Sequence, residues 1–224
     1  MEYNNIITGT FISRPNRFIA YVNVNGSVEK VHVKNTGRCK ELLIDGVKVV
    51  LEISNNPERK TKYDLIAVWK NGMLVNIDSQ APNKVAYEFF RELSEADTEI
   101  ISEYTLGNSR FDLLLRKGEK KTLIEVKGVT LENDGLALFP DAPTERGLKH
   151  VNELIANIKK GYECIIFFVV QMKGPHSFMP NFEMHPEFGK AVRKAAESGV
   201  KVCAYDCVVT EGSMRIDKEV KVIL

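Results

Sequence analysis

One stretch of the chain, residues 110–127, constrains the fold more than any other. Two short apolar runs, Phe111 to Leu115 and Thr122 to Val126, flank a polar segment that contains a glycine, a pattern typical of a β-hairpin. Side chains alternate between the two faces of a strand, so Glu125 and Lys127 lie on one face. The hairpin therefore carries an acidic and a basic side chain side by side among apolar residues.

The hairpin also brings a second carboxylate within reach. Asp112 lies on the strand that neighbours Glu125, and paired strands are only about 4.8 Å apart. Because Mg²⁺ prefers oxygen ligands and often uses only one or two protein carboxylates, these residues predict a site for Mg²⁺ or Mn²⁺. Such a metal lowers the pKa of a bound water and neutralises charge on a phosphate, while Lys127 would orient the water. The pattern predicts phosphodiester hydrolysis.

A plainer interpretation is that these are solvated charges on an exposed hairpin, which is what a bare Glu-x-Lys pattern usually represents. Here Asp112 and Glu125 each lie among apolar neighbours, where an isolated charge is costly. The aspartate, followed thirteen positions later by Glu-Val-Lys, resembles the core of the PD-(D/E)XK nuclease superfamily. That resemblance implies that Asp112 and Glu125 are metal ligands and that Lys127 is the catalytic lysine.

Residues 1–81 read as a separate β-rich domain. Asn25-Gly26 with alternating flanks is a strong hairpin signal. Five short strands and a brief helix near residues 39–43 predict a small closed barrel of the OB type, a fold that often binds single-stranded nucleic acid or oligosaccharides. The expected strands are residues 6–13, 18–24, 28–34, 47–53 and 63–69.

The predicted barrel is also the more basic half of the chain. Residues 1–81 hold 11 Lys and Arg against 8 Asp and Glu, whereas residues 82–224 hold 20 against 22. Arg38 follows the polar turn Asn35-Thr36-Gly37, where backbone N–H groups and a guanidinium could hold a phosphate. Ordinary solvated charges at turns are the alternative. The candidate DNA-binding residues here are Arg14, Arg17, Lys34 and Arg38.

Residues 82–224 predict an α/β domain with a restriction-endonuclease-like mixed sheet flanked by helices. Pro82-Asn83 leads into a helix that carries Glu88. A first-helix glutamate often joins the metal site in the nuclease superfamily, so the resemblance makes Glu88 a candidate third carboxylate. Glu103, on the strand before the hairpin, is the competing candidate, and a solvated helix face is the alternative for Glu88.

A second helix is predicted from about residue 144 to Lys160, after a proline-containing start at Asp141 to Thr144. The continuously apolar run from Cys164 to Val170 then predicts a central strand. This order again resembles the nuclease superfamily, in which Arg146, or His150 one turn later, would face the metal site and hold a phosphate. A structural role for His150 is the alternative.

The composition of the chain predicts where the protein is located and which partners it lacks. No apolar run approaches the roughly 20 residues of a membrane helix, and the first residues lack the pattern of a signal peptide. The four cysteines include no Cys-x-x-Cys pair and read as buried reduced thiols. We expect a cytoplasmic protein without membrane partners. The net charge of +1 argues against coating nucleic acid by bulk charge.

Taken together, the longer motifs resemble the sugar fermentation stimulation protein A (SfsA) family over essentially the whole chain. The matching segments are Asn35-Thr36-Gly37-Arg38, Ser109-Arg110-Phe111-Asp112, residues 125–130, residues 139–147 and Lys149-His150. Within them we take Arg110, Asp141 and His150, together with Glu103, as supporting residues. The resemblance implies an N-terminal OB-like domain, a C-terminal nuclease-like domain and DNA binding.

Two functions remain open at this point. The first is a Mg²⁺- or Mn²⁺-dependent nuclease in which the barrel holds DNA and the second domain cuts it. The second is a non-catalytic DNA-binding regulator of sugar metabolism genes that keeps the nuclease fold. The absence of a helix-turn-helix pattern predicts DNA binding without strong sequence preference. A homo-oligomer is compatible with either function.

Overall fold

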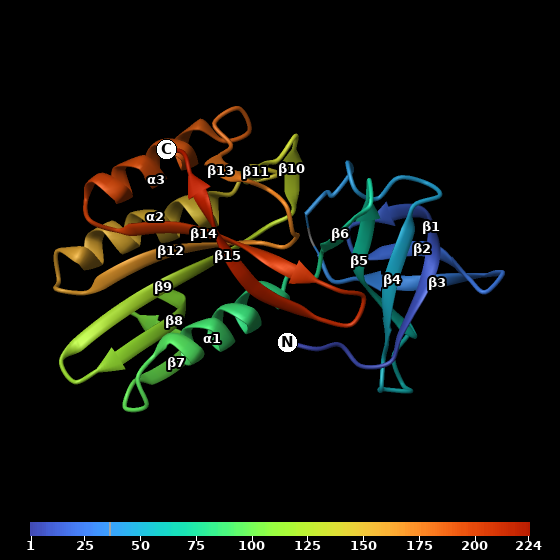
Figure 1. Cartoon of the computed structure of the whole chain (residues 1–224), viewed down its shortest axis with the longest axis horizontal. Helices are drawn as coiled ribbons and strands as arrows, with labels where there is room; N and C mark the ends of the chain where they lie inside the picture. The colour runs from blue at the N-terminus through green and yellow to red at the C-terminus, as the bar shows by residue number, and fades with distance from the viewer. Residues whose placement is uncertain (36) are drawn as a thin grey trace.

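The structure is a computed structural model that describes residues 1–35 and 37–224. A β-barrel and a larger α/β domain lie side by side, with the first strands in the barrel and the C-terminus beyond α3 in the α/β domain (Figure 1). Thr36, part of the predicted phosphate-binding turn, lies outside the described residues.

The barrel is a sheet of order β3-β2-β1-β4-β5-β6 that closes through an additional pairing between β3 and β5. The closing pair is parallel, His32 opposite Asp64, while the other strand pairs are antiparallel. Five strands thus form a closed barrel, as the sequence predicted for an OB-type domain. Its strands are β1 (Ile6–Asn16), β2 (Ile19–Val24), β3 (Ser27–Val33), β4 (Lys48–Ile53), β5 (Tyr63–Lys70) and the added β6 (Met73–Asn76).

One turn of the barrel was predicted correctly from local sequence, one predicted helix is wrong, and one strand was not predicted. Asn25 and Gly26 both have positive φ, 52° and 87°, which matches the turn that Asn-Gly favours between β2 and β3. The predicted helix near residues 39–43 is wrong: this segment forms only a turn, in which Leu43 N donates to Cys39 O at 2.9 Å. The strand β6 was not predicted, because its four residues are too short to show a periodicity.

The α/β domain is built on a nine-stranded mixed sheet of order β10-β11-β13-β15-β14-β12-β9-β8-β7. The apolar strand β12 lies near its centre and pairs in parallel with β9 and β14, as a continuously apolar run predicts. The strands are β7 (Glu99–Leu106), β8 (Ser109–Lys117), β9 (Lys120–Val129), β10 (Leu131–Asn133), β11 (Leu136–Phe139), β12 (Glu163–Val170), β13 (Ser177–Pro180), β14 (Lys201–Val209) and β15 (Met214–Val222).

Three helices cover the two faces of this sheet: α1 (Ala81–Leu93), α2 (Glu145–Ile158) and α3 (Pro186–Glu197) (Figure 1). Successive residues of β9 separate the two cores. Ile124 packs in the cluster that includes Val85 of α1, whereas Leu123 packs in the cluster that includes Val151 of α2. Among the described residues, no helix is long and apolar enough to cross a membrane.

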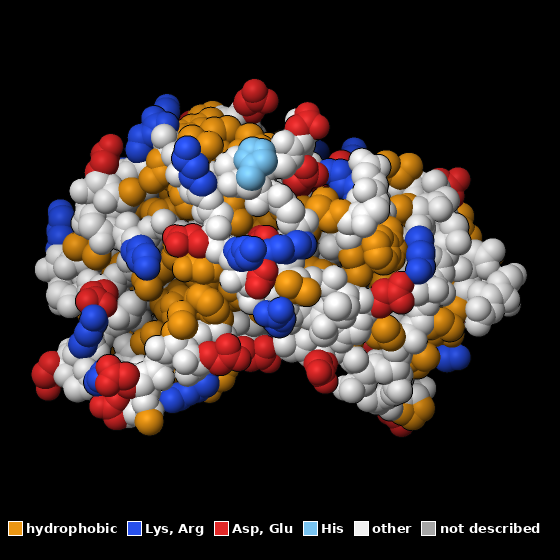
Figure 2. Space-filling view, in the orientation of Figure 1, with side chains coloured by type: hydrophobic (Ala, Val, Ile, Leu, Met, Phe, Trp, Pro, Cys, Tyr) orange, Lys and Arg blue, Asp and Glu red, His pale blue; other side chains and the backbone are white. Residues whose placement is uncertain are grey.

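The four cysteines are buried and unpaired, as the sequence predicted. Burial raises the pKa of the Cys39, Cys164 and Cys203 thiols to about 12. They are therefore protonated at neutral pH and behave as small apolar side chains. On the face drawn in Figure 2, basic and acidic side chains are interspersed over both domains.

Buried polar groups hold the barrel and the α/β domain together. The Gln171 side-chain amide donates to the carbonyl oxygens of Asn76 and Asp78, both at 3.1 Å, and Asn76 N donates to Gln171 O at 2.9 Å. Asn76, Asp78 and Gln171 are each no more than 2% exposed. Unpaired polar groups at such a depth are costly, so this pairing favours one relative placement of the domains.

A second polar cluster of the barrel surrounds the buried Asp64. Asp64 is 3% exposed and receives two hydrogen bonds from Arg59, at 2.7 and 2.8 Å, and pairs with His32 at 2.8 Å. Burial opposes the charge of Asp64, but the hydrogen bonds from Arg59 and His32 and the charge of Lys34 outweigh it. The pKa of Asp64 is therefore held below its usual value.

Asp64→Asn should lower the melting temperature at pH 7 by about 5–10 °C, because breaking a partly exposed pair of this kind costs about 2–3 kcal/mol. A depressed pKa gives stability that is present above about pH 4 and lost as the pH falls further. The difference in melting temperature between wild type and Asp64→Asn should therefore shrink below pH 4. Asp97→Asn, at an exposed position, is the control, and a constant difference across pH would contradict the assignment.

Candidate functional site

The two carboxylates of the predicted hairpin meet across β8 and β9. Leu113 pairs with Ile124, so Asp112 and Glu125 are the next residues along the two strands. Asp112 Oδ2 accepts a hydrogen bond from Val126 N at 2.7 Å, which fixes the aspartate against β9. The structure thus brings together the two residues that sequence spacing suggested.

Asn83, in the first turn of α1, supports the aspartate from the other side. Its Nδ2 donates to Asp112 Oδ1 at 2.8 Å. Sequence reasoning missed this residue, although an asparagine directly after Pro82 at a helix start was a visible signal. Both oxygens of Asp112 are therefore oriented by donors, and its position does not depend on a metal.

Glu125 is the most buried charge of the site, with 1% exposure. Its Oε1 contacts both Lys127 Nζ and His150 Nδ1, which come from the same strand and from α2. Its Oε2 is buried and has no hydrogen-bond partner among the described residues. A buried carboxylate oxygen without a partner is unfavourable, so a hydrogen-bond donor or a cation would be stabilised at this atom.

The surroundings move the two carboxyl pKa values in opposite directions. Burial, followed by repulsion from Glu125, raises the pKa of Asp112. Burial also opposes the charge of Glu125, but the hydrogen bond from His150 and the charge of Lys127 outweigh it and lower the pKa of Glu125. The ionised form of Glu125 is thus favoured. The ionised form of Asp112 is disfavoured, and a bound cation would stabilise it.

These residues fit a hard divalent cation. Asp112 and Glu125 supply carboxylate oxygens, and Glu125 Oε2 is the orphaned atom that a cation would satisfy. Among residues 1–35 and 37–224, no group of three or more His, Cys, Asp or Glu side chains is arranged to hold a metal. Two protein carboxylates leave the other coordination positions to water and phosphate, as is common for Mg²⁺.

Neither candidate for a third carboxylate joins this pair. Glu88 lies on the solvent side of α1, 49% exposed, and its Oε2 is 2.6 Å from the N-terminal amine of Met1. Glu103 stands opposite Asp112 in the strand register, but its φ of 54° turns the side chain outward. Glu103 is 66% exposed and lies 3.6 Å from Arg110, which is exposed as well.

Two of the predicted DNA-binding residues are engaged within the protein. Arg14 donates four hydrogen bonds of 2.6–2.9 Å to backbone carbonyl oxygens, those of Arg17, Asn35, Gly37 and Arg38. Lys34 donates to Glu52 at 3.1 Å and lies 3.6 Å from Asp64 and 3.7 Å from Asp78. We therefore remove Arg14 and Lys34 from the set that can contact phosphate.

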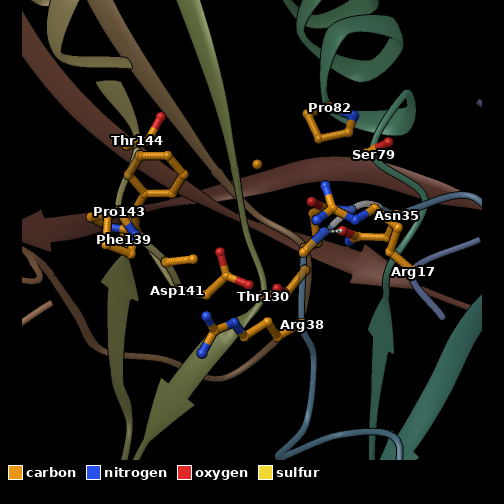
Figure 3. Close-up of a pocket in the computed structure, with 15 residues that line it drawn as sticks. Arg17, Asn35, Arg38, Ser79, Pro82, Thr130, Phe139, Asp141, Pro143 and Thr144 are labelled. Carbon is orange, nitrogen blue, oxygen red and sulfur yellow. Dashed lines mark hydrogen bonds between the residues drawn. The ribbon is translucent and has the colours of Figure 1, made fainter. Parts of the chain in front are cut away.

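The other predicted residues are at least partly exposed to solvent. Arg17, Arg38 and Asp141 line a cavity of about 530 Å³ between the two domains (Figure 3). Arg146 is exposed in the first turn of α2, four residues before His150 and so on the same face of the helix. Arg146 therefore lies one helical turn from His150, whereas Asp141 lies outside the carboxylate pair.

Comparisons with known proteins cover both domains. Residues 12–77 match the family model for the SfsA N-terminal OB domain, and residues 80–213 match that for the sugar fermentation stimulation protein RE domain. A sugar fermentation stimulation protein homolog from Clostridium beijerinckii is 53% identical, with all of both chains covered. One from Alkaliphilus oremlandii is 52% identical over 99% of this chain and 98% of the relative.

A solved structure is similar along the whole chain as well. It is the structure of Pyrococcus furiosus SfsA in complex with Ca²⁺, which superimposes with a TM-score of 0.88 at 27% identity. The match covers 100% of this chain and 98% of that chain. The barrel, the mixed sheet and their connection therefore recur together in a distant relative.

The metal site predicts that Asp112→Asn weakens Mn²⁺ binding at least tenfold, since losing even an outer-shell partner of a metal commonly costs about 10- to 100-fold. Isothermal titration calorimetry with Mn²⁺ measures this directly. Glu88→Gln is the matched control and should bind Mn²⁺ as wild type does, because Glu88 lies outside the pair. Equal binding by wild type and Asp112→Asn would remove the proposed site.

Proposed function

The chain belongs to the SfsA family, and we propose that it is a DNA-binding nuclease that uses Mg²⁺ or Mn²⁺ to hydrolyse phosphodiester bonds. The observation that carries this proposal is the buried Glu125, paired with Lys127 and His150 through one oxygen and unpaired at the other, beside Asp112. A purely structural ion pair would not need an oxygen without a donor.

Each residue has a distinct role in the proposed reaction. When bound, a divalent metal supplies Lewis acidity and a water of lowered pKa. Asp112 and Glu125 hold that metal, and their own positions are set by Asn83, Val126 N and His150. Lys127, 14% exposed, donates to Glu125 and keeps further N–H bonds with which to orient a water or a phosphate oxygen.

His150 acts here as a positioning residue. Its Nδ1 contacts the same Glu125 oxygen as Lys127, so it fixes the carboxylate with the other oxygen directed away. Arg146, on the same face of α2, is placed to hold the phosphate on the solvent side.

Two observations outside the site support metal and DNA as partners. The relative from Pyrococcus furiosus is described in complex with Ca²⁺, another hard cation with oxygen ligands. The barrel has OB topology, a fold whose surface binds single strands in many proteins, and it presents Arg17 and Arg38 toward the α/β domain.

A non-catalytic DNA-binding regulator is the second candidate, and one observation favours it. Lys127 already forms an ion pair with Glu125, and no third carboxylate completes the site among the described residues. In a protein that has lost nuclease activity, Lys127 would serve only to balance the charge of Glu125. The two functions differ in whether Lys127 is required for an activity.

Lys127→Ala should reduce cleavage at least about 100-fold, as losing one transition-state donor commonly does. Its affinity for DNA should change little. Purified protein is incubated in Mn²⁺ with linear, nicked, branched and single-stranded DNA and with RNA. Lys127→Gln guards against misfolding of the alanine variant, since it keeps most of the side-chain length and a neutral donor, and Lys190→Ala at an exposed position of α3 is the control. No cleavage by wild type, or cleavage by both Lys127 variants as fast as by wild type, would contradict the nuclease and favour the regulator.

A further inference from the structure

The cavity at the domain junction is built from both domains (Figure 3). The barrel contributes Arg17, Asn35 and Arg38, and the α/β domain contributes Thr130, Asp141 and Gln171. The carboxylate of Asp141 lies against the backbone of Gly37, so segments separated by about a hundred residues touch here. Neither domain alone would form this cavity.

The cavity adjoins the carboxylate site. Pro82 and Gly128 line it, and their chain neighbours Asn83 and Lys127 belong to the site. Consecutive Cα atoms are about 3.8 Å apart, so the cavity begins within one residue of the proposed chemistry. Nucleotides along a stacked strand are spaced about 3.4 Å apart, so one strand can occupy the cavity and the site together.

The cavity presents positive groups that the protein does not neutralise. Four other arginines each form an ion pair with a carboxylate: Arg59, Arg110, Arg116 and Arg215. Arg17 and Arg38 form none with the described residues. Both side chains are exposed. A guanidinium binds phosphate through two parallel hydrogen bonds, so these two groups suit a phosphodiester.

Arg14 fixes the loops that carry these arginines. Its guanidinium holds the backbone oxygens of Arg17 and Arg38 at 2.8 and 2.7 Å, and those of Asn35 and Gly37 at 2.6 and 2.9 Å. Two loops of the barrel are thus tied to one side chain. Such preorganisation lowers the entropic cost of binding.

The rest of the lining suits a base and a sugar. Asp141 offers acceptors beside Arg38 in Figure 3, and Thr130 offers a hydroxyl. Phe139 also lines the cavity and gives an aromatic surface near these polar groups. A polar edge beside an aromatic surface is how proteins commonly recognise an unpaired base.

We propose that this junction cavity binds one unpaired nucleotide of a DNA strand, with its phosphate on Arg17 and Arg38, while the adjacent phosphodiester lies at Asp112, Glu125 and Lys127. This rests on the proposed function for the cutting step alone. Cavities of about 300–1,000 Å³ enclose one small molecule, so this cavity of about 530 Å³ has room for one nucleotide, whose base must leave its pair to enter. The substrate class is therefore DNA with single-stranded segments or frayed ends.

Binding is measured in EDTA, where no cleavage occurs, by fluorescence anisotropy with a single-stranded oligonucleotide and a dumbbell duplex of the same length whose two ends are closed by non-nucleotide linkers, so that it has no unpaired base. Wild type should bind the single strand at least tenfold more tightly than the dumbbell. Arg17→Ala with Arg38→Ala should abolish this preference and lower the salt slope for the single strand by about 0.7 to 1.4, for one or two lost phosphate contacts. Free dAMP should compete with the single strand.

The control variant is Arg116→Ala with Arg215→Ala, which removes the same charge away from the cavity and should keep the preference. An equal loss in both double variants would overturn the proposal. A dAMP signal that the single strand does not displace would also overturn it, because the cavity would then serve a free nucleotide.

Arg14→Lys tests the positioning role. It keeps the charge but lacks the planar fork that reaches four oxygens, so the preference for single strands should fall at least about threefold while the melting of the barrel, followed by circular dichroism, remains cooperative. An unchanged preference would contradict the role of Arg14. Because these measurements need no metal, their failure is distinct from failure of Mn²⁺-dependent cleavage, which tests the nuclease itself.

Discussion

The rest of the site depends on one buried charge, the carboxylate of Glu125. At 1% exposure an ionised group must be compensated within the protein, and Lys127 and His150 both contact one of its oxygens. This requirement fixes α2 against β9, because His150 has to reach the strand. It also leaves Oε2 without a hydrogen-bond partner among the described residues, which is where the proposed cation would bind. The buried charge of Glu125 therefore explains both the packing of α2 on β9 and the proposed metal site.

The placement of the barrel depends on a second set of buried groups. Gln171, Asn76 and Asp78 satisfy one another at the junction, and sliding one domain over the other would break all of these bonds at once. Gly128 makes the close approach possible, since a Cβ there would collide with Gln171 Oε1 and with Pro82 Cγ at 2.7 Å. The junction cavity and the carboxylate site keep their relative position for this reason.

The hairpin and the barrel could be predicted from sequence because strand alternation and turn chemistry are local properties. Asp112 and Glu125 met as expected for the same reason. That neither Glu88 nor Glu103 joins the pair could not be predicted, since the direction of each side chain depends on the rotation of α1 and on a single φ angle. Arg14 and Arg17 lie three residues apart and look alike, and only the hydrogen bonds that Arg14 donates to distant backbone oxygens, such as those of Asn35 and Gly37, separate their roles.

A net charge of +1 is no obstacle to binding a polyanion when the charge is placed at a junction. Charges in a recess bounded by protein are screened less than charges on an open surface, and the recess focuses their field. Arg59 and Lys34 of the barrel are neutralised by Asp64 and its neighbours, which leaves Arg17 and Arg38 to set the local potential. The ion pairs around Asp64 thus leave Arg17 and Arg38 as the arginines of the barrel whose charge faces the α/β domain, where a strand would enter.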